Sequence, residues 1–313
     1  MDFTSNREIL DQVIRDRESI RPIATHRKAD GSIDVESNLR LWNTIIVKFK
    51  QIQLWEAGAP DFDESFILQP QPSIIFIPSP LEDVRGTVIV AHGGGFEIRT
   101  GSEGFHTADF FNKMGFNVAI LTYRLKPYTR FDAIADMQRA VRILRSRADE
   151  LHISNIISVM GFSAGGMLSA NCGTHFDNGQ QHADDPVDRY SCRPDAVVVG
   201  YGAFSFAAFS MELFTNVFTD PNRAETIYLS PDKNISAATP PFFIWQTNPD
   251  DPRFSLNLAK ELTDAGVPFE LHCFPDGPHG VALADGNNDM DYRLPHLMHW
   301  SELCAEWLEG IGL

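Results

Sequence analysis

Two glycine-rich turns, each directly after a run of apolar and β-branched residues, constrain the fold of this 313-residue chain more than any other feature. The first run covers residues 86–91 and leads into a His-Gly-Gly-Gly tract at 92–95. The second covers residues 155–160 and leads into a Gly-Phe-Ser-Ala-Gly tract at 161–165. Short apolar runs bounded by turn signals are typical of strands buried in a parallel sheet, whose carboxyl edge carries functional turns. The sequence therefore predicts two such strands that end in turns at the same edge.

The rest of the chain alternates between strand-like and helix-like segments. Further strands are expected near residues 51–56, 73–77, 116–123, 195–200, 241–247 and 269–274. Apolar residues at helical spacing predict helices near residues 103–114, 132–151, 165–172 and 294–308. Such alternation predicts an α/β fold, a doubly wound and mostly parallel sheet with helices on both faces. No linker or low-complexity tract interrupts the pattern, so we expect one domain over residues 1–313.

Two segments depart from the alternation. Residues 1–50 have apolar side chains at near-helical spacing and predict a helical arm, which either covers part of the active-site mouth or packs on the body. Residues 203–240 follow a predicted strand and are rich in phenylalanine. An insertion at that point would lie above the carboxyl edge of the sheet. We expect a small lid or pocket wall there, with plain core as the alternative.

Charge and cysteine usage limit the partners and the compartment. The chain has 26 Lys and Arg against 42 Asp and Glu, a net charge of −16, which argues against nucleic acid and anionic membranes as partners. The four cysteines are widely spaced and are expected to be reduced and mostly buried, although a Cys172–Cys192 bridge stays open. The first residues lack the apolar core of a secretion signal, and no apolar run is long enough to span a bilayer. The sequence favours a cytoplasmic protein.

The two turns together indicate acyl transfer, most simply ester hydrolysis. Ser163, between two glycines at a strand-to-helix turn, is the predicted nucleophile. The backbone N–H groups of Gly94, Gly95 and Ala164 are predicted to stabilise the negative oxygen that forms when a serine attacks a carbonyl. Serine needs a base to remove its proton, and His279 is the best candidate because its loop directly follows the last predicted strand. His296 and His299 lie on the final helix, and His92 is expected to brace the glycine turn.

On these motifs the chain resembles the α/β-hydrolase superfamily, and within it the hormone-sensitive-lipase-like and acetyl-esterase or acetylxylan-esterase-like serine hydrolases. The resemblance covers roughly residues 70–312. It is carried by five segments: 92–96, 161–166, 240–247, 265–272 and 277–280. It implies the α/β-hydrolase fold, a serine carboxylic-ester hydrolase and a triad acid after the strand that ends at Thr247. The spacing of related enzymes favours Asp250 as that acid, and Asp251 is its rival.

The substrate is expected to be a small-molecule ester. Phe96, Phe204, Phe206, Phe209 and Phe214 are predicted to line an apolar entrance, which favours a short acyl group or an apolar alcohol rather than a polysaccharide chain. The same machinery would also serve a biosynthetic thioesterase, lactonase or acyl transferase. A non-catalytic binding protein of this fold is less favoured, because every triad position is filled. No cofactor, metal site or nucleotide motif is expected, and homo-oligomerisation stays open.

Overall fold

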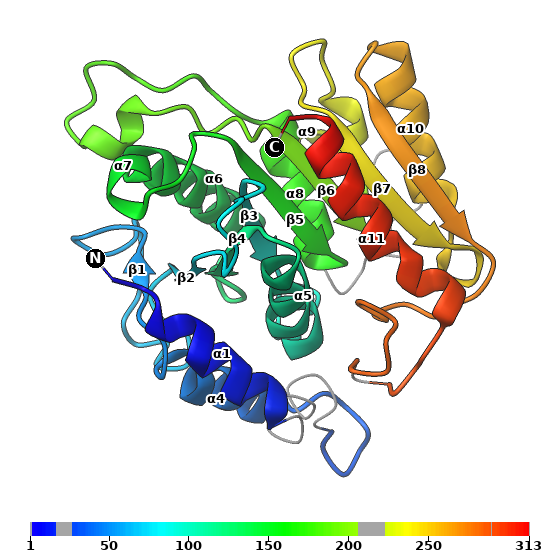
Figure 1. Cartoon of the computed structure of the whole chain (residues 1–313), viewed down its shortest axis with the longest axis horizontal. Coiled ribbons are helices and arrows are strands. Elements are labelled where there is room, and N and C mark those ends of the chain that lie inside the picture. Colours follow the sequence, from blue (N-terminus) through cyan, green and yellow to red (C-terminus); the bar gives the residue numbers. More distant parts are fainter. Residues whose placement is uncertain (1, 17–26, 206–222, 289, 313) are drawn as a thin grey trace.

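The computed structural model describes residues 2–16, 27–205, 223–288 and 290–312, and an eight-stranded sheet lies at its centre (Figure 1). The strands lie in the order β1-β2-β4-β3-β5-β6-β7-β8. All neighbouring pairs from β4 to β8 are parallel, whereas β1 and β2 pair antiparallel. The strand bounds are β1 Ile52–Gln53, β2 Ser73–Ile77, β3 Thr87–Ala91, β4 Asn117–Thr122, β5 Ile157–Phe162, β6 Ala196–Gly200, β7 Phe242–Thr247 and β8 Phe269–Phe274. The predicted mostly parallel sheet is confirmed.

Helices cover both faces of the sheet, and each face buries its own hydrophobic cluster. One face carries α6 (Arg130–Ser146), α8 (Ala164–Thr174) and α10 (Arg253–Asp264). The other carries α5 (Thr107–Lys113) and α11 (Pro295–Gly310), with α1 (Ser5–Arg15) and α4 (Val35–Ile46) beside them (Figure 1). The shorter elements are α7 (Ala148–Leu151), α9 (Arg223–Tyr228), the π-helix η1 (Ser102–His106) and the 3-10 turns η2 (Pro186–Arg189), η4 (Pro231–Lys233) and η5 (Asn248–Asp250).

The parallel pairing of β3 and β5 brings the two glycine turns together. Ala91, the last residue of β3, pairs with Gly161 of β5, so both strands end at the same level of the sheet. Every residue of these two strands is buried, as expected of apolar strands covered on both faces. Gly165 lies so close to β3 that a Cβ atom would be 2.2 Å from the Ala91 carbonyl oxygen. The glycine turn at residues 92–95, called the oxyanion turn below, is therefore in direct contact with the start of α8.

The segments that differ from the expected pattern have local causes. The helix expected at 103–114 opens with the single π-turn η1 before it continues as α5. The helix expected from residue 132 begins two residues earlier, because Thr129 and Asp132 form a capping box around its start. Helix α10 was not among the expected elements. Residues 206–222 of the expected lid at 203–240 lie outside the described residues.

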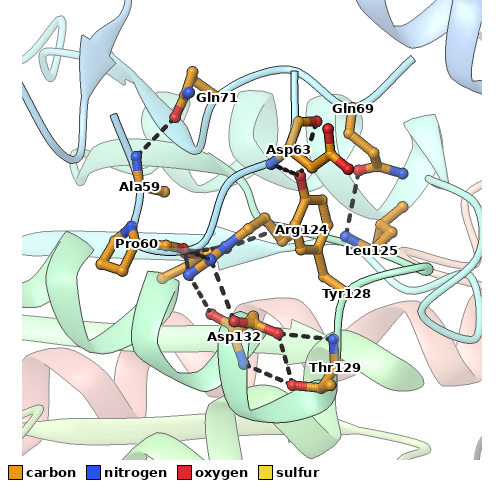
Figure 2. A network of polar contacts seen from close by, with 11 residues as sticks. Ala59, Pro60, Asp63, Gln69, Gln71, Arg124, Leu125, Tyr128, Thr129 and Asp132 are labelled. Atoms are coloured by element: carbon orange, nitrogen blue, oxygen red, sulfur yellow. Dashed lines mark hydrogen bonds and ion pairs between the residues drawn. The ribbon is translucent and has the colours of Figure 1, made fainter. Parts of the chain in front are cut away.

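Arg124 links the loop between β1 and β2 to the start of α6 (Figure 2). Arg124, which follows β4, donates to both oxygens of Asp136, and both side chains are almost completely buried. Arg124 also donates to the Pro60 carbonyl oxygen at 2.7 Å and to the carboxylate of Asp132 at 3.3 Å. Nearby, the Tyr128 hydroxyl accepts from the Asp63 N–H at 2.9 Å. The chain between β1 and β2 is thereby fixed beside the carboxyl end of β4.

The predicted helical arm contributes α1 and α4, which pack through buried apolar residues on the α5 side of the sheet. The Asn38 side chain of α4 makes two hydrogen bonds, both 2.9 Å, with the backbone of Arg99, close to the oxyanion turn. Packing on the body is therefore the observed arrangement. In the described parts of the chain, no helix is both long and apolar enough to cross a membrane.

Candidate active site

Ser163 lies in a strained turn between β5 and α8. Its φ of +51° and ψ of −120° belong to a region that a residue with a side chain rarely adopts. The turn is tight, because a Cβ atom on Gly161 would lie 2.0 Å from the carbonyl oxygen of Gly165. The Ser163 N–H donates to the Gly200 carbonyl oxygen at 3.0 Å, which ties the turn to β6. The glycines flanking the serine thus permit a bend that presents its hydroxyl at the sheet edge.

His279 and Asp250 complete a continuous row of hydrogen bonds with this serine. The Ser163 Oγ lies 2.8 Å from Nε2 of His279, and Nδ1 of His279 lies 2.7 Å from Oδ2 of Asp250. A carboxylate only accepts, so Nδ1 carries the proton and Nε2 is left to accept the serine hydroxyl proton. His279 is on the loop after β8, and Asp250 ends the 3-10 turn η5 after β7. Three loops at one edge of the sheet therefore supply the three side chains.

The two acid candidates have different partners. Asp250 reaches the imidazole, whereas Asp251 has a left-handed backbone with φ of +47° and pairs with Arg253. Arg253 Nε donates to Asp251 Oδ1 at 2.7 Å. His296 and His299 are exposed on α11, where His299 faces Glu302 at 3.1 Å. Of the predicted residues, the structure brings together Ser163, His279 and Asp250.

The acidic surroundings favour the protonated form of His279. Burial by itself lowers the pKa of this imidazole, but the hydrogen bond and charge of Asp250 outweigh burial. The charge of Glu103 acts in the same direction, and the net result is a pKa raised above the ordinary value. His92 behaves in the opposite way, because complete burial and the nearby Arg99 lower its pKa to about 3. Only His279 of this pair is suited to exchange protons near neutral pH.

The turn after β3 and the start of α8 supply the predicted oxyanion N–H groups. Gly94 and Gly95 have φ of +110° and +63°, and Ala164 is the first residue of α8. Within the described chain, the N–H groups of these three residues have no hydrogen-bond acceptor. The N–H of Gly93 is already used, because it donates to Glu103 Oε2 at 2.7 Å. The predicted oxyanion donors thus remain available to a ligand.

Aromatic side chains pack against the oxyanion turn and support it. His92 Nδ1 lies 2.7 Å from the Gly93 carbonyl oxygen, and its ring stacks on Tyr123 with centroids 4.6 Å apart. Trp42 of α4 packs against the other side of the His92 ring, at 4.8 Å. The Tyr123 hydroxyl donates to the His92 carbonyl oxygen at 2.7 Å. This packing matches the bracing role that the sequence predicted for His92.

A pocket of about 300 Å³ opens beside the three side chains. The residues that line it are Gly95, Ser163, Ala164, Met167, Tyr201, Gly202, Ala203, Gln246, Asp250, Asp251, Phe254 and His279. Phe96 and Phe204 are absent from this lining and are buried in the core instead, so we no longer assign them to substrate contact. Phe206, Phe209 and Phe214 lie outside the described residues.

Three further polar residues of the site escaped the sequence reasoning. Glu103 and Tyr201 are buried and linked through a 2.8 Å hydrogen bond. Gln246 lines the pocket while its Oε1 accepts from the Thr247 N–H at 2.8 Å, so its NH2 group is the end left for a ligand. The position of Gln246 at the end of a predicted strand was a usable signal. Glu103 had none, because nothing local distinguishes it from a surface glutamate.

The described residues contain no group of three or more His, Cys, Asp or Glu side chains that could hold a metal ion. The four cysteines are free thiols, and Cys172, Cys192 and Cys304 are buried while Cys273 is exposed. The Cys172–Cys192 bridge that the sequence left open is therefore not formed.

A family model matches this chain, and proteins of known structure share its fold. Residues 74–264 match the BD-FAE family. The acetyl ester-xyloside bifunctional hydrolase from Caldicellulosiruptor lactoaceticus is 35% identical, with a TM-score of 0.77 over 84% of this chain and 96% of that one. A carboxylesterase from Lactobacillus plantarum, 22% identical, has the same fold, with a TM-score of 0.65 over 84% of this chain and 97% of that one.

Two curated relatives are longer than this chain. The endo-1,4-beta-xylanase B of Butyrivibrio fibrisolvens is 28% identical over 77% of this chain and 39% of its own length. The acetylxylan esterase of Xylanibacter ruminicola is 26% identical over 72% of this chain and 47% of its own length. The chain thus spans less than half the length of these relatives. The predicted resemblance to acetylxylan-esterase-like α/β hydrolases is confirmed, and the chain belongs to the BD-FAE family of α/β-hydrolase enzymes.

Proposed function

We propose that this chain is a serine carboxylic-ester hydrolase in which Ser163 is the nucleophile, His279 the base and Asp250 the acid. The observation that carries the proposal is the unbroken row of hydrogen bonds from Asp250 through His279 to the Ser163 hydroxyl. The unoccupied N–H groups of Gly95 and Ala164, two residues that line the same pocket as Ser163, support it.

The first half of the reaction transfers the acyl group to the enzyme. As the Ser163 oxygen attacks the ester carbonyl, its proton moves to Nε2 of His279. The carbonyl oxygen becomes negative and accepts hydrogen bonds from the oxyanion donors, each worth about 3 kcal/mol in the transition state. His279 then gives its proton to the departing alkoxide. The products of this step are a free alcohol and an acyl-serine.

The second half releases the acid. A water molecule takes the place of the alcohol and loses a proton to Nε2 of His279 as it attacks the acyl-serine. The tetrahedral intermediate uses the same oxyanion donors. When it collapses, the proton on His279 returns to the Ser163 oxygen, and the carboxylic acid leaves. Asp250 keeps the imidazole in the tautomer that both halves require.

The pocket favours an ester of a short acid with a polyhydroxylated alcohol. A volume of about 300 Å³ is small for a ligand site, and the alcohol has to share it with the acyl chain. Met167 and Phe254 form an apolar part of the pocket wall. The NH2 group of Gln246 offers a hydrogen-bond donor to a substrate oxygen. One relative is named an acetyl ester-xyloside bifunctional hydrolase, and another is named an acetylxylan esterase. An acetylated sugar or short oligosaccharide is therefore our first candidate, ahead of the apolar alcohol that the phenylalanines suggested.

The activity is tested with p-nitrophenyl esters of increasing chain length, an acetylated xylo-oligosaccharide, a thioester and a lactone. We expect acetyl esters to react fastest, and the thioester and lactone to react slowly. A clear preference for the thioester or lactone would replace ester hydrolysis with the alternative reactions of the same triad. Inactivity on the whole panel, with the protein folded, would contradict the proposal.

Variants test the assigned roles. Ser163→Ala should abolish both turnover and labelling by a fluorophosphonate probe, and persisting label would refute the assignment. His279→Ala should lower kcat by about 10⁴-fold or more without unfolding the protein. His296→Ala and His299→Ala are the matched controls, since both side chains are exposed on α11. Controls as damaging as His279→Ala would show that the base is misassigned.

A further inference from the structure

Glu103 is a buried carboxylate that touches the oxyanion turn without lining the pocket. It is 2% exposed, in the π-turn η1, a type of turn that is frequent at functional sites. Its hydrogen-bond donors are all neutral: the Gly93 N–H, the Thr100 hydroxyl and the Tyr201 hydroxyl. None of the ion pairs between described residues includes it. Since a buried charge without a countercharge is costly, this carboxylate calls for a role beyond packing.

On one side, Glu103 holds the oxyanion turn. Its Oε2 accepts the Gly93 N–H at 2.7 Å. Gly93 is also wedged against the nucleophile, because a Cβ atom there would lie 2.6 Å from Glu103 Oε2 and 2.9 Å from the Ser163 Cβ. The Gly93 peptide is therefore clamped between the carboxylate and the serine. A fixed Gly93 determines where the N–H groups of Gly94 and Gly95 point.

On the other side, Glu103 reaches the histidine loop through Tyr201. The Tyr201 hydroxyl donates to Glu103 Oε1 at 2.8 Å and accepts the Ala282 N–H at 3.0 Å. Ala282 follows His279 by three residues, and the Tyr201 ring lies edge-on to the imidazole at 5.1 Å. Burial, together with the charge of Glu103, raises the pKa of Tyr201 well above its ordinary value, so the hydroxyl keeps its proton. A chain of hydrogen bonds thus joins the oxyanion turn to the loop of the base.

We propose that Glu103 is a positioning residue for ester hydrolysis, which holds the oxyanion turn and the His279 loop in register and places a negative charge behind the imidazole. This inference rests on the proposed function of Ser163 and His279. The imidazole gains a positive charge in each transition state, and a fixed negative charge nearby favours that form. Asp250 is the direct partner, while the other pocket carboxylate, Asp251, is paired with Arg253.

The test exchanges Glu103 for glutamine, which has the same shape but no charge. Glutamine has one acceptor oxygen, so it satisfies either the Gly93 N–H or the Tyr201 hydroxyl, not both. We expect kcat to fall by about 10–100-fold with KM within about twofold, as expected when reacting groups are displaced by a fraction of an ångström to 1 Å. Asp109→Asn is the matched control, because Asp109 of α5 is also buried but is paired with Arg7 of α1 and with Lys113 of its own helix.

A second readout does not depend on ester turnover. The imidazole of His279, followed by NMR, should titrate at a lower pH in Glu103→Gln than in the wild type, because the charge of Glu103 raises its pKa, and Asp109→Asn should leave the titration unchanged. The rate of fluorophosphonate labelling of Ser163 should fall together with kcat. If the wild type hydrolysed no ester, the proposed function would fail, while the titration and labelling would still decide the role of Glu103.

Tyr201→Phe provides a variant that keeps the charge of Glu103 and the ring beside His279. We expect a smaller loss of kcat, and the double variant should be no worse than Glu103→Gln alone, because both changes break one chain of hydrogen bonds. Tyr201→Phe also carries the test if Glu103→Gln does not fold. Losses that multiply in the double variant would overturn the proposal. So would folded variants with lower thermal stability but wild-type kcat, labelling rate and His279 titration.

Discussion

Replacing Asp250 with asparagine should disable catalysis while leaving the fold intact. The carboxylate accepts the His279 Nδ1 proton at 2.7 Å, and no other residue in the described chain shares this contact. Asparagine would face the imidazole with a neutral amide, whose NH2 group favours the tautomer with its proton on Nε2. That tautomer cannot take the proton of Ser163.

The size of the effect follows from the geometry. An imidazolium and a carboxylate about 4 Å apart attract each other by about 4 kcal/mol at the effective dielectric of a protein surface. Solvent screens part of this attraction, because the His279 side chain is 52% exposed. A charge-assisted hydrogen bond is worth about 1.5–3 kcal/mol. Together these give a loss of about 3–5 kcal/mol in the transition state, or about 10²–10⁴-fold in kcat.

Asp251→Asn is the control, since its carboxylate pairs with Arg253 rather than with His279 and asparagine tolerates the left-handed backbone. The assay is kcat and KM on p-nitrophenyl acetate for both variants, with circular dichroism to confirm folding. Asp250→Asn should lose activity and Asp251→Asn should stay within about threefold of the wild type. A large loss in Asp251→Asn with a near-normal Asp250→Asn would refute the assignment of the acid.

Three further outcomes are expected. The acid limb of the kcat/KM profile should lie above the ordinary imidazole pKa, because the pKa of His279 is raised and activity requires its neutral form; a limb below that value would contradict the geometry. Gly94→Ala should lower kcat by about 10²-fold or more, because the new methyl group would meet the Ile98 carbonyl oxygen at 2.1 Å and displace an oxyanion donor. Arg124→Met should lower the unfolding free energy by about 3–5 kcal/mol, measured by denaturant titration, since it leaves Asp136 buried and unpaired. Burial raises the pKa of Asp136 to about 7 even with Arg124 present, so protonation relieves the variant, and its loss should be smaller at pH 5 than at pH 8.

Local sequence was sufficient to predict features that depend only on the path of the nearby backbone. Apolar strands followed by glycines predicted the two turns and the position of Ser163 in the second of them, because a tight turn needs glycine at particular positions. His279 was predictable for a similar reason, since it stands in a short loop after a strand. The alternation of strands and helices likewise predicted the parallel sheet.

The sequence could not decide between Asp250 and Asp251, because the two are adjacent and only the first lies within the 3-10 turn η5. In the folded chain η5 directs Asp250 to the imidazole, and the left-handed backbone of Asp251 directs that carboxylate to Arg253. The sequence could not place Phe204 for a similar reason. An aromatic side chain after a strand suits both a pocket wall and the core. In the folded chain, packing puts Phe204 in the core.

Glu103 is the residue that tertiary structure alone revealed. Its partner Tyr201 is 98 positions away in the sequence, and the two meet because β3 and β6 flank β5 in the sheet. Sequence patterns report on neighbours within a turn or a strand, where covalent geometry limits the possibilities. Contacts between distant segments depend on how the whole sheet and its helices pack. The sequence by itself therefore determined the fold and the place of Ser163 at the strand-to-helix turn, while tertiary packing decided which acidic side chains surround His279.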